Sequence, residues 1–192
     1  MSWIIEGSGG VPWICSYARS ITAVILLVAA VSKLGTHEEL AAIIDNYRLL
    51  PHRLSLVVAR ELPVAEMIIA GMLLTRSGTK YAGVAAAVLF VIFGGAMAIN
   101  LLRGRANIAC GCFGASQSSP IKWRYVIRNM VLSACALVGV EGFWPSGVSH
   151  PLAISDELAA LLAASVTLAC YWMALTSAMM LKRVSEEVRP AK

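Results

Sequence analysis

Residues 81–102 read YAGVAAAVLFVIFGGAMAINLL, a stretch without a single charged side chain. About 20 apolar residues are enough for an α-helix to cross the hydrocarbon core of a bilayer. The rest of the chain has the same character, since 58% of its residues are hydrophobic, 14% are charged and the mean hydropathy is +0.73. A soluble domain of 192 residues carries far more charge. The sequence therefore predicts an all-α integral membrane protein.

Five apolar stretches are predicted as transmembrane helices, which gives a polytopic bundle with a four-helix core and a C-terminal helix. They cover residues 13–34, 54–75, 81–102, 123–140 and 157–181. We expect one membrane domain, residues 1–181, followed by a short polar tail, residues 182–192. We expect no cleavable signal peptide, because residues 1–11 lack a basic n-region.

The connections between these spans carry their own signals. Residues 35–53 are predicted as a short amphipathic helix that Pro51 ends. Gly78 and the Pro- and Gly-containing segment 142–155 are predicted turns. We call the membrane face where the first span begins side A and the opposite face side B. Five spans then place residues 35–53, the segment after Leu102 and the C-terminal tail on side B.

A Cys110-Gly111-Cys112 motif follows the third span on side B, and Arg103 and Arg105 lie just upstream. Nearby cations favour the thiolate, which is the nucleophilic form of cysteine. A disulfide closed across one glycine is expected to be strained, and strained disulfides are the labile, oxidising ones. The motif therefore predicts a redox-active pair, although the attacking thiol cannot be assigned. We expect Cys15, Cys135 and Cys170 to be buried apolar residues; they lie in or at the end of the predicted helices.

Several polar residues fall inside the spans, mostly in the half of the bundle below the cysteine motif. Charges at such depth are costly and normally face a partner or a water-filled cavity. We predict a polar cavity there in which an acidic group relays protons, although a structural Arg60–Glu66 ion pair and an Arg128 that snorkels to the headgroups stay open. Pro63 is expected to break the second span locally. The predicted cavity residues are Arg60, Glu61, Glu66, Asn100, Arg128 and Asn129.

Short runs along the chain resemble the MauE/DoxX-like family of redox-associated membrane proteins, whose namesakes serve methylamine utilisation. They are NLLRGR from Asn100, CGCFG from Cys110, Trp123, Arg128-Asn129, YRLLP from Tyr47, and ELP from Glu61 followed by Glu66. The resemblance covers about residues 16–140. It implies a multi-pass protein of the bacterial inner membrane that helps methylamine dehydrogenase to mature. It also implies that the protein forms or sorts disulfides in the small subunit of that enzyme, alongside a thioredoxin-like, MauD-like partner.

Other functions stay open at this point. The protein is expected either to exchange disulfides or to hold a thioredoxin-like partner near its client without catalysis. A soft-metal carrier is the third reading: thiolates suit such ions, and Met97 and Met130 are the nearest additional soft ligands, but no His or second Cys pair completes a closed site. No metal site is predicted, and a quinone is a candidate electron acceptor only by analogy with other membrane thiol oxidases.

The net charge of +5 lies mostly in loops and at the C-terminus, so it informs the topology of the protein. No nucleic-acid partner is expected from it. The positive-inside rule places side B in the cytoplasm. A disulfide-forming role instead requires side B to face the periplasm, or electrons to cross the bundle. Side B carries Lys33, Arg48, Arg53, Arg103, Arg105, Lys122, Arg124, Lys182 and Arg183, against Arg76 and Lys80 on side A.

Overall fold

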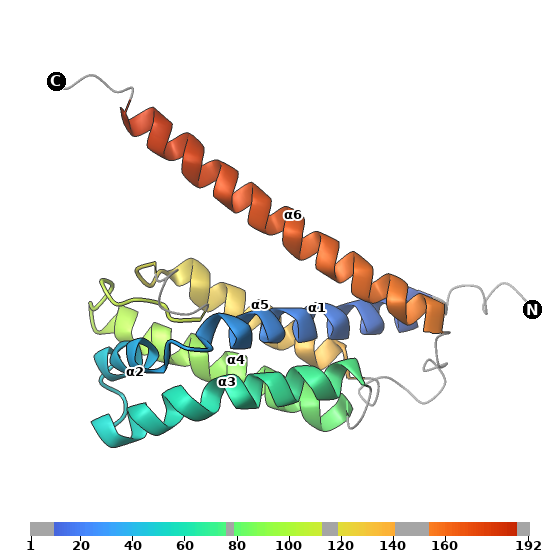
Figure 1. The fold of residues 1–192 in the computed structure, drawn as a ribbon, viewed down its shortest axis with the longest axis horizontal. Helices are drawn as coiled ribbons and strands as arrows, with labels where there is room; N and C mark the ends of the chain where they lie inside the picture. The colour runs from blue at the N-terminus through green and yellow to red at the C-terminus, as the bar shows by residue number, and fades with distance from the viewer. Residues whose placement is uncertain (1–9, 76–78, 113–118, 141–153, 188–192) are drawn as a thin grey trace, which may run out of the picture.

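The computed structural model describes residues 10–75, 79–112, 119–140 and 154–187 (Figure 1). Over these ranges the chain forms helices and no strand, which confirms the predicted all-α class. The apolar stretches became helices because a backbone in lipid must satisfy its own hydrogen bonds. The helices are α1 (Gly10–Lys33), α2 (His37–Asn46), α3 (His52–Leu74), α4 (Thr79–Leu102), α5 (Trp123–Val138) and α6 (Ile154–Glu187).

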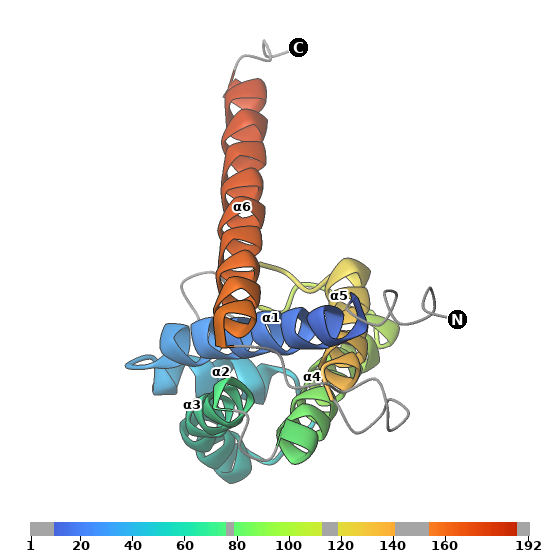
Figure 2. The same cartoon turned by 90° about the vertical axis from the view of Figure 1, so that its right-hand side faces the viewer.

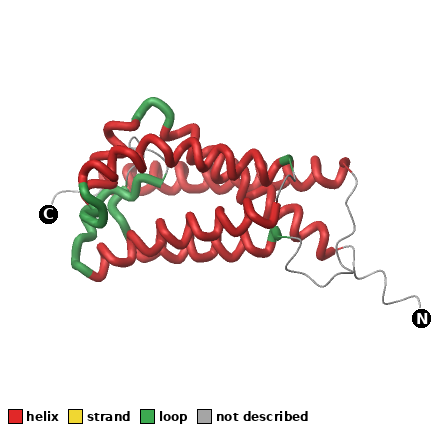
Figure 3. The backbone as a smooth tube through the Cα atoms, turned by 90° about the horizontal axis from the view of Figure 1, so that it is seen from below, coloured by secondary structure: helices red, strands yellow, loops and turns green. Residues whose placement is uncertain are grey.

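Helices α1, α3, α4 and α5 lie side by side as a four-helix bundle (Figures 1 and 2). Helix α1 packs on α3 and α5, and α4 packs on α5 and α3. Helix α2 packs against α3, at the end of the bundle where most of the described loops gather (Figure 3). Helix α6 contacts α1, where the Tyr17 hydroxyl lies 2.9 Å from Thr167 Oγ1, and then diverges from the bundle (Figure 2).

The bundle has small residues in its core and bulky apolar residues on its outer surface. Its core is rich in alanine, and Gly83 and Gly94 let α4 approach α5 closely. A Cβ at Gly83 would collide with a Val140 methyl carbon, and one at Gly94 would lie 2.5 Å from the Met130 methyl carbon. Small residues at the contacts and bulky apolar residues outside are typical of helices packed within lipid. Exposed apolar residues include Val57, Ile68, Val88, Ile92, Ile127 and Val131.

A polytopic membrane bundle accounts for this pattern, because soluble monomers rarely expose large contiguous apolar surfaces. Among the described residues, two helices combine the length and hydropathy of a span on their own: residues 13–33 have a mean hydropathy of 2.0 and residues 79–102 one of 2.4. The other predicted spans are less clear because α5 has 16 residues and α3 carries charged side chains.

Three local expectations are corrected. Helix α2 ends at Asn46 rather than at Pro51, because Arg48 takes a left-handed backbone with a φ of 50°. Pro51 instead precedes the first turn of α3, and α3 continues as a helix through the buried Pro63. Helix α6 continues to Glu187, into the predicted tail. The predicted turn at Gly78 and nearly all of the predicted loop 142–155 lie outside the described residues.

Candidate redox site

The cysteine motif lies in the loop of residues 103–122 that joins α4 to α5. Two backbone hydrogen bonds join the two described segments of this loop: Cys110 N donates to Ser119 O at 3.0 Å, and Ile121 N donates to Ile108 O at 2.9 Å. Ile108 and Ile121 are buried against the bundle. The loop is therefore held in place at the cysteines by both backbone pairing and apolar burial.

Three further hydrogen bonds, made by two side chains, fix this loop to neighbouring segments. The Tyr47 hydroxyl donates to the Cys110 carbonyl at 3.2 Å. The Arg105 guanidinium donates to Asn100 Oδ1 at 3.2 Å and to the Asn46 carbonyl at 2.9 Å. Burial, followed by the neighbouring thiols, raises the pKa of Tyr47, so its hydroxyl keeps the proton that it donates. Both the segment after α2 and the end of α4 thus position the cysteines.

Three sulfur atoms converge inside this frame. Cys110 Sγ lies 3.2 Å from Cys112 Sγ and 3.6 Å from Met97 Sδ of α4. Gly111 has a φ of +70°, a conformation that L side chains rarely adopt. A Cβ at Gly111 would also lie 2.9 Å from Ile43 Cγ2 of α2. The glycine between the thiols is therefore required by both the backbone and the packing.

The two thiols are electrostatically unequal. A hydrogen bond from Cys112 is the main cause that lowers the pKa of Cys110 to about 6, and Arg128 acts in the same direction. The hydrogen bond to Cys110, together with burial, raises the pKa of Cys112. Thiols this close titrate as a pair, and these shifts favour the state in which Cys110 has lost its proton and Cys112 keeps it. Cys110 is thus the cysteine whose surroundings favour the thiolate, the nucleophilic form of the side chain.

The cations that act on the thiols include Arg128 of α5 and, for Cys112, Lys33 at the end of α1. The Arg128 guanidinium carbon also lies 5.2 Å from the centre of the Tyr125 ring. Arg105, which the sequence predicted as a thiolate-stabilising cation, is engaged by asparagines. The cations that favour the thiolate are therefore Arg128 and Lys33, which are far from the cysteines in the sequence, and not the predicted Arg105.

Glu66 is buried and pairs with Lys33 rather than with Arg60 or Arg128. The Lys33 ammonium lies 2.7 Å from Glu66 Oε1 and 2.8 Å from Oε2, and both side chains are 1% exposed. The same ammonium lies 5.9 Å from the centre of the Phe93 ring. Phe93 is one helical turn before Met97, the residue whose sulfur contacts Cys110. The ion pair therefore lies about one turn of α4 further into the bundle than the three sulfur atoms.

The other predicted cavity residues divide into two groups. Asn100 and Asn129 are buried, as predicted, and each side chain donates to a carbonyl of its own helix, Ala96 at 3.1 Å and Tyr125 at 2.8 Å. Arg60 and Glu61 are exposed on the opposite face of α3 from Glu66, so they do not line a cavity beneath the cysteines. The depth of Arg60 and Glu61 along the helix could be read from their place in the sequence, but the face of the helix that carries them was not considered.

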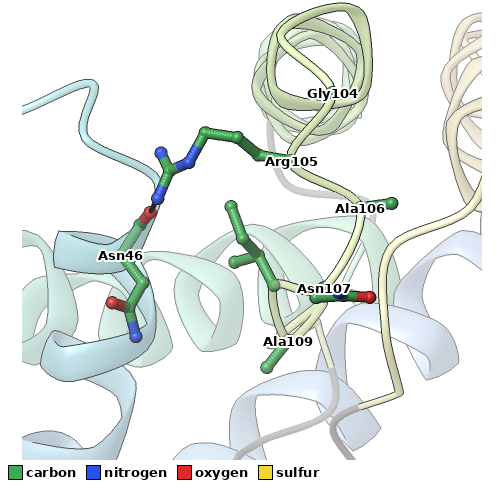
Figure 4. A pocket seen from close by; sticks show the side chains of 7 residues that line it. Asn46, Gly104, Arg105, Ala106, Asn107 and Ala109 are labelled. Atoms are coloured by element: carbon green, nitrogen blue, oxygen red, sulfur yellow. Dashed lines mark hydrogen bonds between the residues drawn. The ribbon is translucent and has the colours of Figure 1, made fainter.

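A pocket of about 500 Å³ opens beside the loop (Figure 4). The Arg105 side chain reaches across it to the end of α2, and neither cysteine lines it. This pocket differs from the predicted cavity, since of the six predicted residues none belongs to its lining. Its lining residues are Asn46, Gly104, Arg105, Ala106, Asn107, Ile108 and Ala109.

Comparison with known proteins identifies the family. Residues 11–141 match the family model described as methylamine utilisation protein MauE. The chain belongs to the MauE family. It is 39% identical to the methylamine utilization protein MauE of Paracoccus denitrificans, over 83% of this chain and 84% of that protein. It is 41% identical to MauE of Paracoccus versutus, over 81% and 82%, and 36% identical to MauE of Methylophilus methylotrophus, over 85% and 84%. No solved structure gives a significant match.

The MauE-family resemblance proposed from short motifs is thus confirmed, but sequence reasoning missed part of the site. Lys33 was counted only as a topology signal, and Tyr47 only as part of a motif. Glu66 was predicted as a site residue, and what separates it from Arg60 and Glu61 is the row of buried positions of α3, which recur every three or four residues. That row contains Glu66 and omits Arg60 and Glu61. The buried row is Ser55, Ala59, Pro63, Glu66, Ala70 and Leu73.

Proposed function

We propose that this MauE-family protein is a multi-pass, inner-membrane thiol–disulfide redox protein. Its task would be to help a partner protein acquire its disulfides, with the small subunit of methylamine dehydrogenase as the client. The observation that carries the proposal is the Cys110–Cys112 pair, whose sulfurs lie 3.2 Å apart in a loop fixed to one end of the bundle. The family's name supplies the link to methylamine utilisation.

The exchange requires a pair that can gain and lose two electrons. In the oxidised pair, a partner thiolate attacks one sulfur and the Cys110–Cys112 bond breaks, which leaves a mixed disulfide and one thiolate. The partner's second thiolate then breaks the mixed disulfide, so the partner leaves oxidised and the pair is left reduced, as a dithiol once protonated. A thiol of lower pKa leaves faster, so attack at Cys112 with departure of Cys110 is favoured. Re-oxidation needs a two-electron acceptor, for which a quinone is the candidate.

The electron donor must come to this loop. The cysteines are tied to Tyr47 and flanked by the Arg105 anchor, so the loop cannot extend deep into a folded client. A thioredoxin-like protein presents its own cysteines at its surface and therefore fits the role of intermediary. We infer that such a protein, MauD-like in kind, carries electrons between the client and Cys110–Cys112.

We also propose that the cysteine loop faces the periplasm, where disulfides persist. The charge count favours the opposite orientation, but two of the residues counted are bound within the fold. Lys33 pairs with Glu66, and Arg105 binds Asn46 and Asn100. A maleimide that cannot cross membranes should therefore label the reduced cysteines in intact spheroplasts. Labelling only after lysis would place the loop in the cytoplasm.

Replacement of the cysteines tests the function. In a methylamine-utilising bacterium that lacks its own copy, the Cys110→Ser, Cys112→Ser double variant should fail to restore growth on methylamine and disulfide formation in the client. The matched control is Cys135→Ser, a cysteine within α5 outside the loop. A fully functional double variant would support instead a non-catalytic partner that holds a thioredoxin-like protein near its client.

A further inference from the structure

Thiol–disulfide exchange needs two sulfur atoms, yet the loop packs its thiols against a third. Met97 Sδ lies 3.6 Å from Cys110 Sγ, and the Met97 side chain is 1% exposed. A thioether neither forms a disulfide nor carries a proton in the exchange. Because Met97 belongs to α4, it brings a soft sulfur donor to the thiols from outside their loop. We call Cys110, Cys112 and Met97 the sulfur cluster.

The donor set of this cluster has a defined metal preference. Thiolate and thioether sulfur select soft ions such as Cu(I), whereas zinc in proteins is almost always bound by four ligands or by three and a water. Among the described residues, no group of three His, Cys, Asp or Glu side chains is placed to hold a metal. A third ligand can therefore come from the thioether, and the set of three sulfurs excludes the hard divalent ions.

The spacing of the sulfurs is close to what such an ion needs. Three sulfurs at about 2.3 Å from a central ion lie about 4 Å apart in a trigonal plane. In the structure Cys110 Sγ lies 3.2 Å from Cys112 Sγ and 3.6 Å from Met97 Sδ. An ion would therefore have to spread each of these two pairs by less than about 1 Å, and methionine's flexible side chain can supply the shift on the Met97 side.

The surroundings also suit a compact anionic centre. Two thiolates and a monovalent cation leave one negative charge, and the Arg128 cation acts on both thiols. Apolar side chains, including Ile108, Ile121 and Tyr47, pack around the sulfurs. A shell of this kind limits access of water to a metal centre.

We propose that reduced Cys110 and Cys112 together with Met97 bind one soft monovalent metal ion, Cu(I) or Ag(I). Binding displaces the thiol protons that remain and occupies both thiolates, so the metal and the Cys110–Cys112 disulfide exclude each other. The site requires only the reduced thiols, and it stands whether or not the pair exchanges disulfides with a partner. Soft metal would then inhibit any redox activity of the pair.

The test uses the reduced full-length protein in detergent without oxygen, with Cu(I) titrated against the chelator bicinchoninic acid. We expect one ion per protein, and Met97→Leu should weaken binding by about 10-fold or more, since loss of even an outer-shell partner of a metal ligand typically costs about that much. The matched control is Met130→Leu on α5, which should leave the affinity unchanged because that side chain is 39% exposed and packs near Gly94.

X-ray absorption on the Cu(I)-loaded wild type keeps the proposal testable if Met97→Leu does not fold. Three sulfur scatterers per copper support the site. Two sulfur scatterers, or equal affinities of wild type and Met97→Leu, would show adventitious chelation by the cysteine pair and overturn it. Binding that persists in the Cys110→Ser, Cys112→Ser variant would do the same.

Discussion

Lys33 Nζ, at the last residue of α1, lies 2.7 Å from Glu66 Oε1 in the middle of α3. Glu66 is 14 residues after His52, so α3 begins about 21 Å beyond this pair at 1.5 Å per residue. Helix α2 and the first turns of α3 therefore lie past the end of α1, and the cysteine loop meets this part at Ile43 of α2 and at Tyr47. The Lys33–Glu66 ion pair thus lies where α3 passes the end of α1, and it joins these two helices.

Loss of one partner should be worse than loss of both. Glu66→Gln leaves the Lys33 ammonium buried without its counter-ion, which costs about 3–5 kcal/mol in typical cases. We expect a clearly lower thermal unfolding midpoint in detergent, with activity reduced more than membrane insertion. The combined Lys33→Met, Glu66→Met variant should recover much of the stability. The matched control is Glu61→Gln, an exposed residue on the same helix. A Glu66→Gln protein that is fully active and stable would show that the pair is idle.

Gly111→Ala should impair the redox pair for two separable reasons. The left-handed backbone costs an L residue about 1–2 kcal/mol, and the new Cβ would lie 2.9 Å from Ile43 Cγ2. Gly104→Ala has the first penalty without the second, because Gly104 has a φ of +72° and no heavy atom within 4 Å of an added Cβ. We expect slower oxidation of the thiols by a chemical oxidant in Gly111→Ala than in Gly104→Ala, with partial recovery on adding Ile43→Ala. Equal rates in the two glycine variants would contradict the steric account.

The reactivity of Cys110 should follow pH. Because its pKa is lowered to about 6, its alkylation rate should rise as the pH increases through about 6 and level off above it, since only the thiolate reacts. Cys112, whose pKa is raised, should stay slow over the same range. Mass analysis of the alkylated peptide measures both. Arg128→Met should move the Cys110 profile to higher pH, whereas Arg103→Met, at an exposed residue, should not. A profile centred near the ordinary thiol pKa would contradict the assignment of Cys110.

The helices could be predicted closely because a long apolar run has few alternatives to a helix in lipid. Residues 81–102 became α4 at Thr79–Leu102, and residues 123–140 became α5 at Trp123–Val138. The closeness of the thiols was also readable, since one residue separates them. The pairing of Lys33 with Glu66 was not, because a count of spans does not give the relative displacement of α1 and α3. The turn at Arg48, which no glycine or proline marks, was likewise hidden.

The central claim is that Cys110 and Cys112 form a disulfide that opens and closes as the protein works. Membranes from cells growing on methylamine can be quenched in acid, alkylated with one reagent, reduced, and alkylated with a second of different mass. We predict that a fraction of the Cys110–Cys112 peptide carries two copies of the second reagent. That fraction should approach zero after prior reduction, while Cys135 carries the first reagent throughout. A peptide that carries the first reagent on both cysteines in cells with an active protein would contradict the claim.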